Sequence, residues 1–118
     1  MVFTGRNAKA NEEAEQSLGN QAHGIVSDAA KLEDIQRLKA QVKAVAPKVD
    51  ILFLNAGIAR FSPLDQVTAG FYDQIFDVNF KGAYLTIQAL LLLVNDGGSI
   101  ILNTSSNAHF GRGIQAGR

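Results

Sequence analysis

Four sets of small and polar residues each follow a short apolar run of the chain. They are Gly5-Arg6, Ser27-Asp28, Asn55-Ala56-Gly57 and Ser105-Ser106. In α/β proteins ligands bind at the carboxyl ends of the strands, so residues in these places are the ones that could do chemistry. The small side chains of Asn55-Ala56-Gly57 would let the backbone come close to a flat ligand. The pattern favours a nucleotide-binding domain of the α/β class.

The elements that must position these residues can be predicted from the apolar pattern. The run Ile51-Leu52-Phe53-Leu54 carries no charge, which is typical of a strand buried on both faces. We predict strands at 2–4, 24–26, 49–54 and 99–104, and helices at 8–18, along the apolar stripe Leu32, Ile35, Leu38, Val42 and Val45, and at 68–94. Gly19 and Pro47 should end the first two helices, Thr68 should cap the third, and Asn95-Asp96-Gly97-Gly98 should form a turn.

Strands that alternate with helices of this length indicate a doubly wound, Rossmann-like parallel sheet of the α/β class, covered by helices on both faces. We interpret residues 1–118 as a single, partial NAD(P)-binding domain. Because the carboxyl ends of parallel strands meet at one edge, all four sets of polar residues would lie on the same rim.

The composition excludes several other functions. Eleven basic residues balance eleven acidic ones without a basic cluster, so neither nucleic acid nor an anionic membrane is an expected partner. The absence of Cys removes disulfides, thiolate catalysis and zinc-finger sites, and we expect no metal. The longest purely apolar run, at 89–94, is too short to cross a bilayer, and no signal sequence follows Met1, so a cytoplasmic location is expected.

Several motifs together resemble the short-chain dehydrogenase/reductase family. They are Asp28, Asn55-Ala56-Gly57, Asp77-Val78-Asn79 and the run from Gly98 to Ser105, which occur in the family's order and at similar spacing. The resemblance covers the chain from Val2 to about Gly111. It implies an oxidoreductase that transfers hydride between a nicotinamide cofactor and a small carbonyl or alcohol substrate. Members of the family often form homo-oligomers.

The resemblance also assigns two residues to the cofactor. Arg6 stands where the family's cofactor-discriminating residue is expected, and a guanidinium there can pair with the 2′-phosphate of NADP, whereas a carboxylate would bind the ribose of NAD. NADP is therefore preferred to NAD. Asp28 matches the aspartate that accepts a hydrogen bond from the adenine amino group. The alternatives are a solvated arginine at the start of a helix and a helix N-cap.

Two further motifs carry expectations of the same kind. Asn55-Ala56-Gly57 resembles the second half of the family's Asn-Asn-Ala-Gly signature, which admits the adenosine side of the cofactor. Leu54 replaces the first Asn, which should loosen the sheet locally, and a turn without a ligand is the alternative. Asn79 matches the family Asn that distorts its helix and holds a proton-relaying water. The alternative is an exposed Asn on the solvent face.

The family's catalytic serine corresponds to Ser105 or Ser106, and counting along the strand favours Ser105. The resemblance implies that this hydroxyl binds the substrate carbonyl and helps to stabilise charge. His23 and His109 are each solitary and are not expected to act as bases.

The family's remaining parts are not found in the sequence. A Tyr acid and its Lys should follow the serine, but Tyr72, Tyr84 and Lys81 all precede Ser105. No glycine-rich pyrophosphate turn precedes Val2, and the central strand of a 3-2-1-4-5 sheet is absent with it. We therefore expect a chain truncated at both ends that is inactive alone and binds cofactor weakly, with two strand pairs whose inner edges are unpaired.

Two other interpretations stay open on the sequence alone. One is a non-enzymatic remnant that retains weak nucleotide affinity or serves as an interaction module through its exposed sheet edges. The other is a fold of the flavodoxin type, which would need a phosphate loop that the sequence does not contain.

Overall fold

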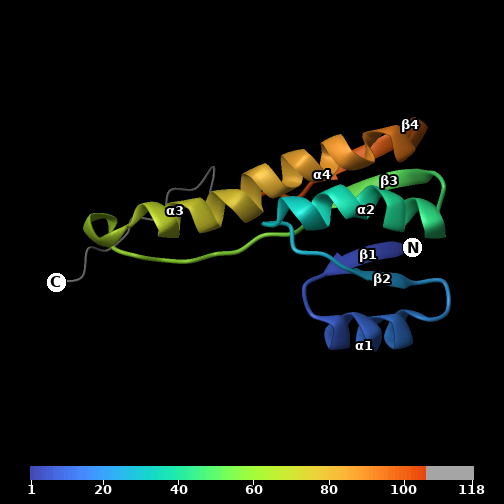
Figure 1. Cartoon of the computed structure of the whole chain (residues 1–118), viewed down its shortest axis with the longest axis horizontal. Helices are drawn as coiled ribbons and strands as arrows, with labels where there is room; N and C mark the ends of the chain where they lie inside the picture. Colours follow the sequence, from blue (N-terminus) through green and yellow to red (C-terminus); the bar gives the residue numbers. More distant parts are fainter. Residues whose placement is uncertain (106–118) are drawn as a thin grey trace.

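The computed structural model describes residues 1–105, in which strands and helices alternate (Figure 1). The strands are β1 (Val2–Gly5), β2 (His23–Val26), β3 (Val49–Leu54) and β4 (Val94–Leu102), and the α-helices are α1 (Ala8–Leu18), α2 (Leu32–Val45), α3 (Ala69–Phe76) and α4 (Ala83–Leu90). Three short helical segments complete the list, the 3-10 turns η1 (Leu64–Gln66) and η3 (Leu91–Leu93) and the π-helical η2 (Asp77–Gly82).

The strands form two separate parallel pairs, β1 with β2 and β3 with β4. All four run in the same direction, away from the end of the molecule where the N-terminus lies (Figure 1). Within residues 1–105 no strand lies between β1 and β3. The Rossmann-like α/β class is confirmed, and so is the expectation of two strand pairs with unpaired inner edges.

Helices α2 and α4 join the two pairs through a small shared core. Its buried residues come from β2, α2, α4 and η3, and residues of β1 and β3 pack against them: Ile25, Leu38, Val42, Leu90 and Leu93, then Val2, Val49 and Leu52. Helix α1 covers the opposite face of the β1–β2 pair (Figure 1). No large side chain among the described residues is completely buried, so this core is thin for a domain of this length.

The helix boundaries follow from local chemistry. Asn7 Oδ1 accepts a hydrogen bond from the Ala10 amide at 3.1 Å and begins α1, and Gly19, with φ of 91°, ends it. Thr68 Oγ1 accepts from the Phe71 amide at 3.1 Å, so the predicted cap of α3 is confirmed.

The long helix predicted over 68–94 is not uniform. It passes through a π-helical segment at Asp77–Gly82 and ends as a 3-10 turn at Leu93. Gly82 lies where this helix crosses the loop before α2, and a Cβ at this position would clash with the backbone of Ala29. Only glycine allows this close approach.

The prediction that residues 95–98 form a turn is wrong, because these residues belong to β4. The register steps from Val49 opposite Val94 to Ile51 opposite Ser99, so the extra residues form a bulge within the strand. The strand bends in this bulge at Gly97, whose φ is 80°. The strand also ends at Leu102, earlier than the predicted residue 104.

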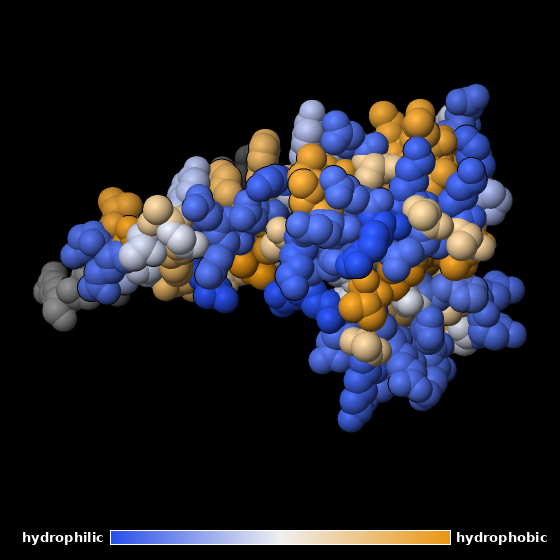
Figure 2. Space-filling view, in the orientation of Figure 1, coloured by the Kyte–Doolittle hydropathy of each residue, from blue (hydrophilic) through white to orange (hydrophobic). Residues whose placement is uncertain are grey.

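The molecule is elongated, with extents of 54 × 33 × 26 Å, because α3 and the loop before it extend beyond the strands (Figure 1). Figure 2 shows hydrophobic side chains at the surface along this arm and over α4. Within residues 1–105, no helix has the length and apolar character needed to cross a membrane.

Candidate functional site

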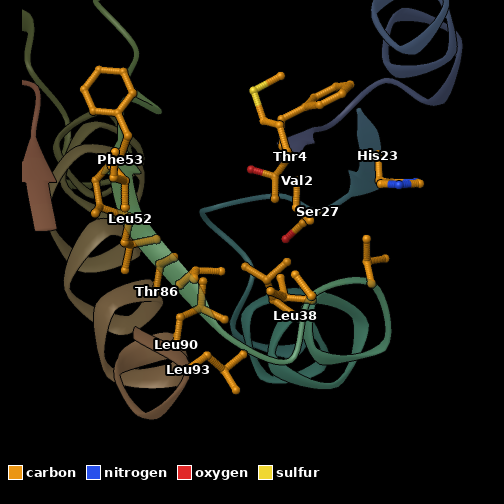
Figure 3. A pocket seen from close by; sticks show the side chains of 18 of the residues that line it. Val2, Thr4, His23, Ser27, Leu38, Leu52, Phe53, Thr86, Leu90 and Leu93 are labelled. Atoms are coloured by element: carbon orange, nitrogen blue, oxygen red, sulfur yellow. The ribbon is translucent and has the colours of Figure 1, made fainter. Parts of the chain in front are cut away.

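Four strand ends form one rim, because all four strands are parallel. At one side of it the Ser27 amide donates to the Gly5 carbonyl at 3.1 Å, joining the ends of β1 and β2. A cavity of about 1060 Å³ extends between the two strand pairs, and its lining includes Ser27, Asn55 and Ala56 (Figure 3). The structure thus brings residues of both pairs to one space, while Arg6 and Asp28 lie just outside its lining.

Asp28 is held in place by the loop that contains it. Its Oδ1 accepts from the Ala30 amide at 3.0 Å, and its own amide donates to Asp34 Oδ2 at 2.8 Å. Lys31 is the N-cap of α2, so the alternative that Asp28 caps this helix is wrong. Asp28 instead closes a short turn through this hydrogen bond to Ala30 and is half-buried.

Asp34 supports this loop from the first turn of α2. The backbone hydrogen bond from Asp28 and the side-chain hydrogen bond from Arg37 hold the pKa of the Asp34 carboxyl below its ordinary value. Asp34 is not among the site residues predicted from the sequence. Its position three residues after the N-cap was the available signal, since an acidic residue there commonly reaches back to the preceding backbone.

Asn55 ties the ends of β3 and β4 together. Its Oδ1 accepts from Asn103 Nδ2 at 2.6 Å, and the Asn103 amide donates to the Leu54 carbonyl at 3.0 Å. The pairing of β3 with β4 continues to Leu54 opposite Leu102, so the loosening expected at Leu54 does not occur between these strands. Ala56 and Gly57 follow and are both exposed, as close approach of a flat ligand would require.

Asn79 lies in the π-helical segment and holds the loop that follows β3. Its Oδ1 accepts from the Ile58 amide at 2.8 Å and its Nδ2 donates to the Ile58 carbonyl at 2.8 Å. The distortion of the helix that the resemblance implied is therefore present, and π-helical segments often occur at functional sites. The carboxamide fixes the backbone next to Gly57, and the water relay stays a prediction.

Arg6 lies on the exposed turn between β1 and α1. Among the described residues no salt bridge involves its guanidinium. It directly precedes Asn7, the N-cap of the eleven-residue helix α1, whose N-terminus favours negative charge. An anion near this turn would meet both the guanidinium and the helix end.

The remaining candidates are placed as follows. Ser105 is exposed, takes part in an interaction of its own and is the last described residue, after the end of β4. Ser106 and His109 lie outside the described residues. His23 begins β2 and so stands at the amino end of its strand, away from the rim. Residues 1–105 contain no group of three His, Asp or Glu placed to hold a metal ion.

Comparison with known proteins agrees with this architecture. The sequence profile of the short chain dehydrogenases matches residues 1–117. The oxidoreductase asL5 of Sarocladium schorii is 36% identical over 109 residues, which is 91% of this chain and 44% of that protein.

Two solved structures show the same fold. A short chain dehydrogenase of Burkholderia cenocepacia in complex with NADP superposes with a TM-score of 0.82 at 27% identity, over 94% of this chain and 47% of that one. The 3-ketoacyl-(acyl-carrier-protein) reductase of Brucella melitensis, complexed with NADH, has a TM-score of 0.83 at 25% identity, over 91% and 47%.

The chain belongs to the short-chain dehydrogenase/reductase family. It spans about half the length of the relatives that it matches, since coverage of those proteins is 44 to 47%.

Proposed function

We propose that this chain supplies the adenosine-binding part of an NADP-dependent oxidoreductase that acts on a small carbonyl or alcohol substrate. The observation that carries the proposal is the rim at the carboxyl ends of the four strands, where Arg6, Asp28 and Asn55-Ala56-Gly57 each follow a strand. This is the place where doubly wound sheets bind nucleotides. Membership of the family supports the reaction class.

The residues at the rim fit the chemistry of the cofactor. Asp28 uses Oδ1 for the Ala30 amide, and its carboxylate would also accept a hydrogen bond from the adenine amino group; Ala56 and Gly57 are small and exposed and would admit a flat ring. Arg6 would pair with the 2′-phosphate, since a guanidinium binds phosphate through charge-assisted hydrogen bonds. When bound, the nicotinamide supplies or accepts the hydride.

NADP is proposed over NAD because of the residues at the end of β1, where Arg6 follows Gly5. The two solved structures hold NADP in one protein and NADH in the other, so the fold accommodates either cofactor. A carboxylate at the end of β1 would favour the ribose hydroxyls of NAD, but Gly5 stands there.

Two residues are proposed to serve the reaction itself. The Ser105 hydroxyl would donate a hydrogen bond to the substrate carbonyl oxygen and stabilise the charge that develops on it. Asn79 would keep the loop at 55–58 in position through its two hydrogen bonds to Ile58.

The test uses the 2′-phosphate as the probe. NMR shift titrations with adenosine 2′,5′-bisphosphate and with 5′-AMP suit the weak affinity expected of this chain. Wild type should bind the bisphosphate about tenfold more tightly, which corresponds to roughly 1.4 kcal/mol for one charge-assisted pair. Arg6→Ala should remove this preference, and Asp28→Asn should weaken both ligands. Lys43→Ala, which removes one positive charge from an exposed position in the last turn of α2, is the control.

Equal affinity of the wild type for the two nucleotides would refute the role of Arg6. Shifts confined to residues away from the rim would refute the site as a whole.

We also infer that one side of the continuous helical stretch formed by α3, η2 and the first turn of α4 is a contact surface for a second copy of the chain. Tyr72, Phe76, Phe80 and Tyr84 recur every four residues and are 51, 45, 69 and 63% exposed. Exposed aromatic stripes of this kind mark protein interfaces. Phe80→Glu should lower the sedimentation-derived molar mass if copies associate here, and an unchanged mass would contradict this surface.

A further inference from the structure

Helix α1 packs against β1 and β2 through a polar residue. Asn11 is buried, with 8% of its surface exposed, whereas most of its neighbours in the helix are exposed. It lies over Gly5 at the end of β1 and Gly24 in β2, on the face of the strand pair that α1 covers (Figure 1). A buried carboxamide costs free energy unless its polar atoms have partners. Its contacts therefore show what Asn11 does at this position.

The Asn11 side chain holds the end of β1. Its Nδ2 donates to the Gly5 carbonyl at 3.3 Å. The same carbonyl accepts from the Ser27 amide at 3.1 Å, which joins the ends of β1 and β2 at the rim. Asn11 therefore fixes the backbone immediately before Arg6, the residue proposed to bind the 2′-phosphate.

The same side chain excludes a Cβ from position 5. A Cβ at this position would lie 3.2 Å from Asn11 Cγ and would clash with Asn11 Oδ1. Rotation of the carboxamide about χ2 would move Oδ1, but it would leave Cγ in place and break the hydrogen bond to the Gly5 carbonyl. Crowding of this kind in a packed contact forces side chains out of their preferred rotamers. Position 5 therefore accepts only glycine while Asn11 is present.

The backbone at position 5 would otherwise accept other residues. Among the described residues, Gly19 and Gly97 are the ones with a positive φ, so Gly5 has a conformation that L-residues adopt. Gly5 also pairs with Val26 in the regular register of β1 and β2. The requirement for glycine comes from Asn11 and not from the path of the chain.

In the proposed function, position 5 affects which nucleotide the rim prefers. A carboxylate there would bind the ribose hydroxyls and repel a 2′-phosphate, whereas the Arg6 guanidinium attracts it. We propose that Asn11 is a specificity-determining residue of the nucleotide site, which excludes acidic side chains from position 5 and so maintains the preference for a 2′-phosphate. This inference rests on the proposed function, because it concerns the same rim.

Unfolding measurements test the steric part. Gly5→Ala should lower the folding equilibrium constant about tenfold in the otherwise unchanged chain, but by less than about twofold in Asn11→Ala, where the added Cβ has room. Gly70→Ala is the matched control, because nothing lies within 4 Å of a Cβ at this position, and its effect should be the same in both backgrounds. An equal loss from Gly5→Ala in both backgrounds would overturn the proposal.

NMR shift titrations with adenosine 2′,5′-bisphosphate and 5′-AMP test the specificity. The wild type should prefer the bisphosphate, and the double variant Asn11→Ala/Gly5→Asp should lower this ratio of affinities by about tenfold or more. Asn11→Ala alone should keep the wild-type ratio even where both affinities fall, since a purely structural loss weakens both nucleotides alike. A wild-type ratio in the double variant, or a changed ratio in Asn11→Ala alone, would overturn the proposal.

The outcomes separate this inference from the proposed function. If the wild type prefers the bisphosphate but positions 5 and 11 are not coupled, this inference alone fails. If the wild type binds neither nucleotide at the rim, or binds both equally, the proposed function fails and this inference fails with it. If Asn11→Ala does not fold, Gly5→Ala in the otherwise unchanged chain still decides, because an unchanged folding equilibrium constant would show that Asn11 leaves room for a side chain.

Discussion

Replacement of Asn79 by Ala separates a local effect from a global one. The substitution removes both hydrogen bonds to Ile58, each of 2.8 Å, from the loop that follows β3. It leaves the packing of the core unchanged, because Asn79 is exposed and is not part of the buried cluster.

The expected magnitude follows from these contacts. Each hydrogen bond contributes about 0.5–1.5 kcal/mol net, so the closed loop should lose about 1–3 kcal/mol relative to its open form. Alanine restores up to about 0.7 kcal/mol of helix propensity within the helix. The free energy of global unfolding should therefore fall by about 0.3–2.3 kcal/mol, which is the loss in the loop less the gain in the helix, while the loop opens more often.

Amide hydrogen exchange measures the two effects separately. The Ile58 amide should exchange about five- to 150-fold faster in Asn79→Ala, which corresponds to the 1–3 kcal/mol above. Urea unfolding gives the global term. Asn95→Ala, which removes the hydrogen bond to Asp50 at the other end of the molecule, should leave Ile58 unaffected. Unchanged exchange at Ile58, or equal acceleration along the whole chain, would refute the reasoning.

Three further predictions concern the core, a close contact and the acid limb of stability. Leu38 is 3% exposed, so Leu38→Ala should lower the free energy of unfolding in urea by about 2–5 kcal/mol. Leu92 is 72% exposed, so Leu92→Ala should change this free energy by less than about 0.5 kcal/mol. Gly82→Ala should destabilise the fold, because the added Cβ would clash with the backbone of Ala29. Gly70→Ala, in the open first turn of α3, should stabilise the fold by up to about 1 kcal/mol. A higher melting temperature for Gly82→Ala than for Gly70→Ala would contradict the close contact at Gly82. Because the pKa of Asp34 is lowered in the folded state, its ionised carboxylate adds stability that is complete above the ordinary pKa of 3.8. This stability is lost as the pH falls through the lowered pKa. Asp34→Asn should remove this part of the dependence of unfolding on acid pH, measured by urea unfolding at a series of pH values.

Local sequence signals predicted most of the elements. Alternation of apolar runs and amphipathic stretches gave the order of strands and helices, and Thr68 marked the start of α3 because capping depends on neighbouring residues only. Errors occurred where a distant segment decides the outcome. The residues 95–98 have turn composition, yet Val94 pairs with Val49, and this contact draws them into β4 as a bulge.

The site shows the same division. The residue types at the strand ends indicated a nucleotide-binding rim, because parallel strands place their carboxyl ends together. The use that each side chain makes of its polar atoms could not be predicted. Asn55 bonds to Asn103 across 48 residues, and Asn79 bonds to Ile58 across 21. No local pattern encodes such pairs, since both partners are ordinary polar residues until the fold brings them together.

The sequence by itself determined the α/β class, the polarity of the strands and the set of small and polar residues that follow them, because these depend on periodicity and on neighbours in the chain. Only the tertiary structure decided that residues 95–98 join β4 as a bulge, that Asn55 bonds to Asn103, and that Asn79 fixes the loop after β3. These features depend on distances between segments far apart in the chain, which packing sets and which no single segment contains.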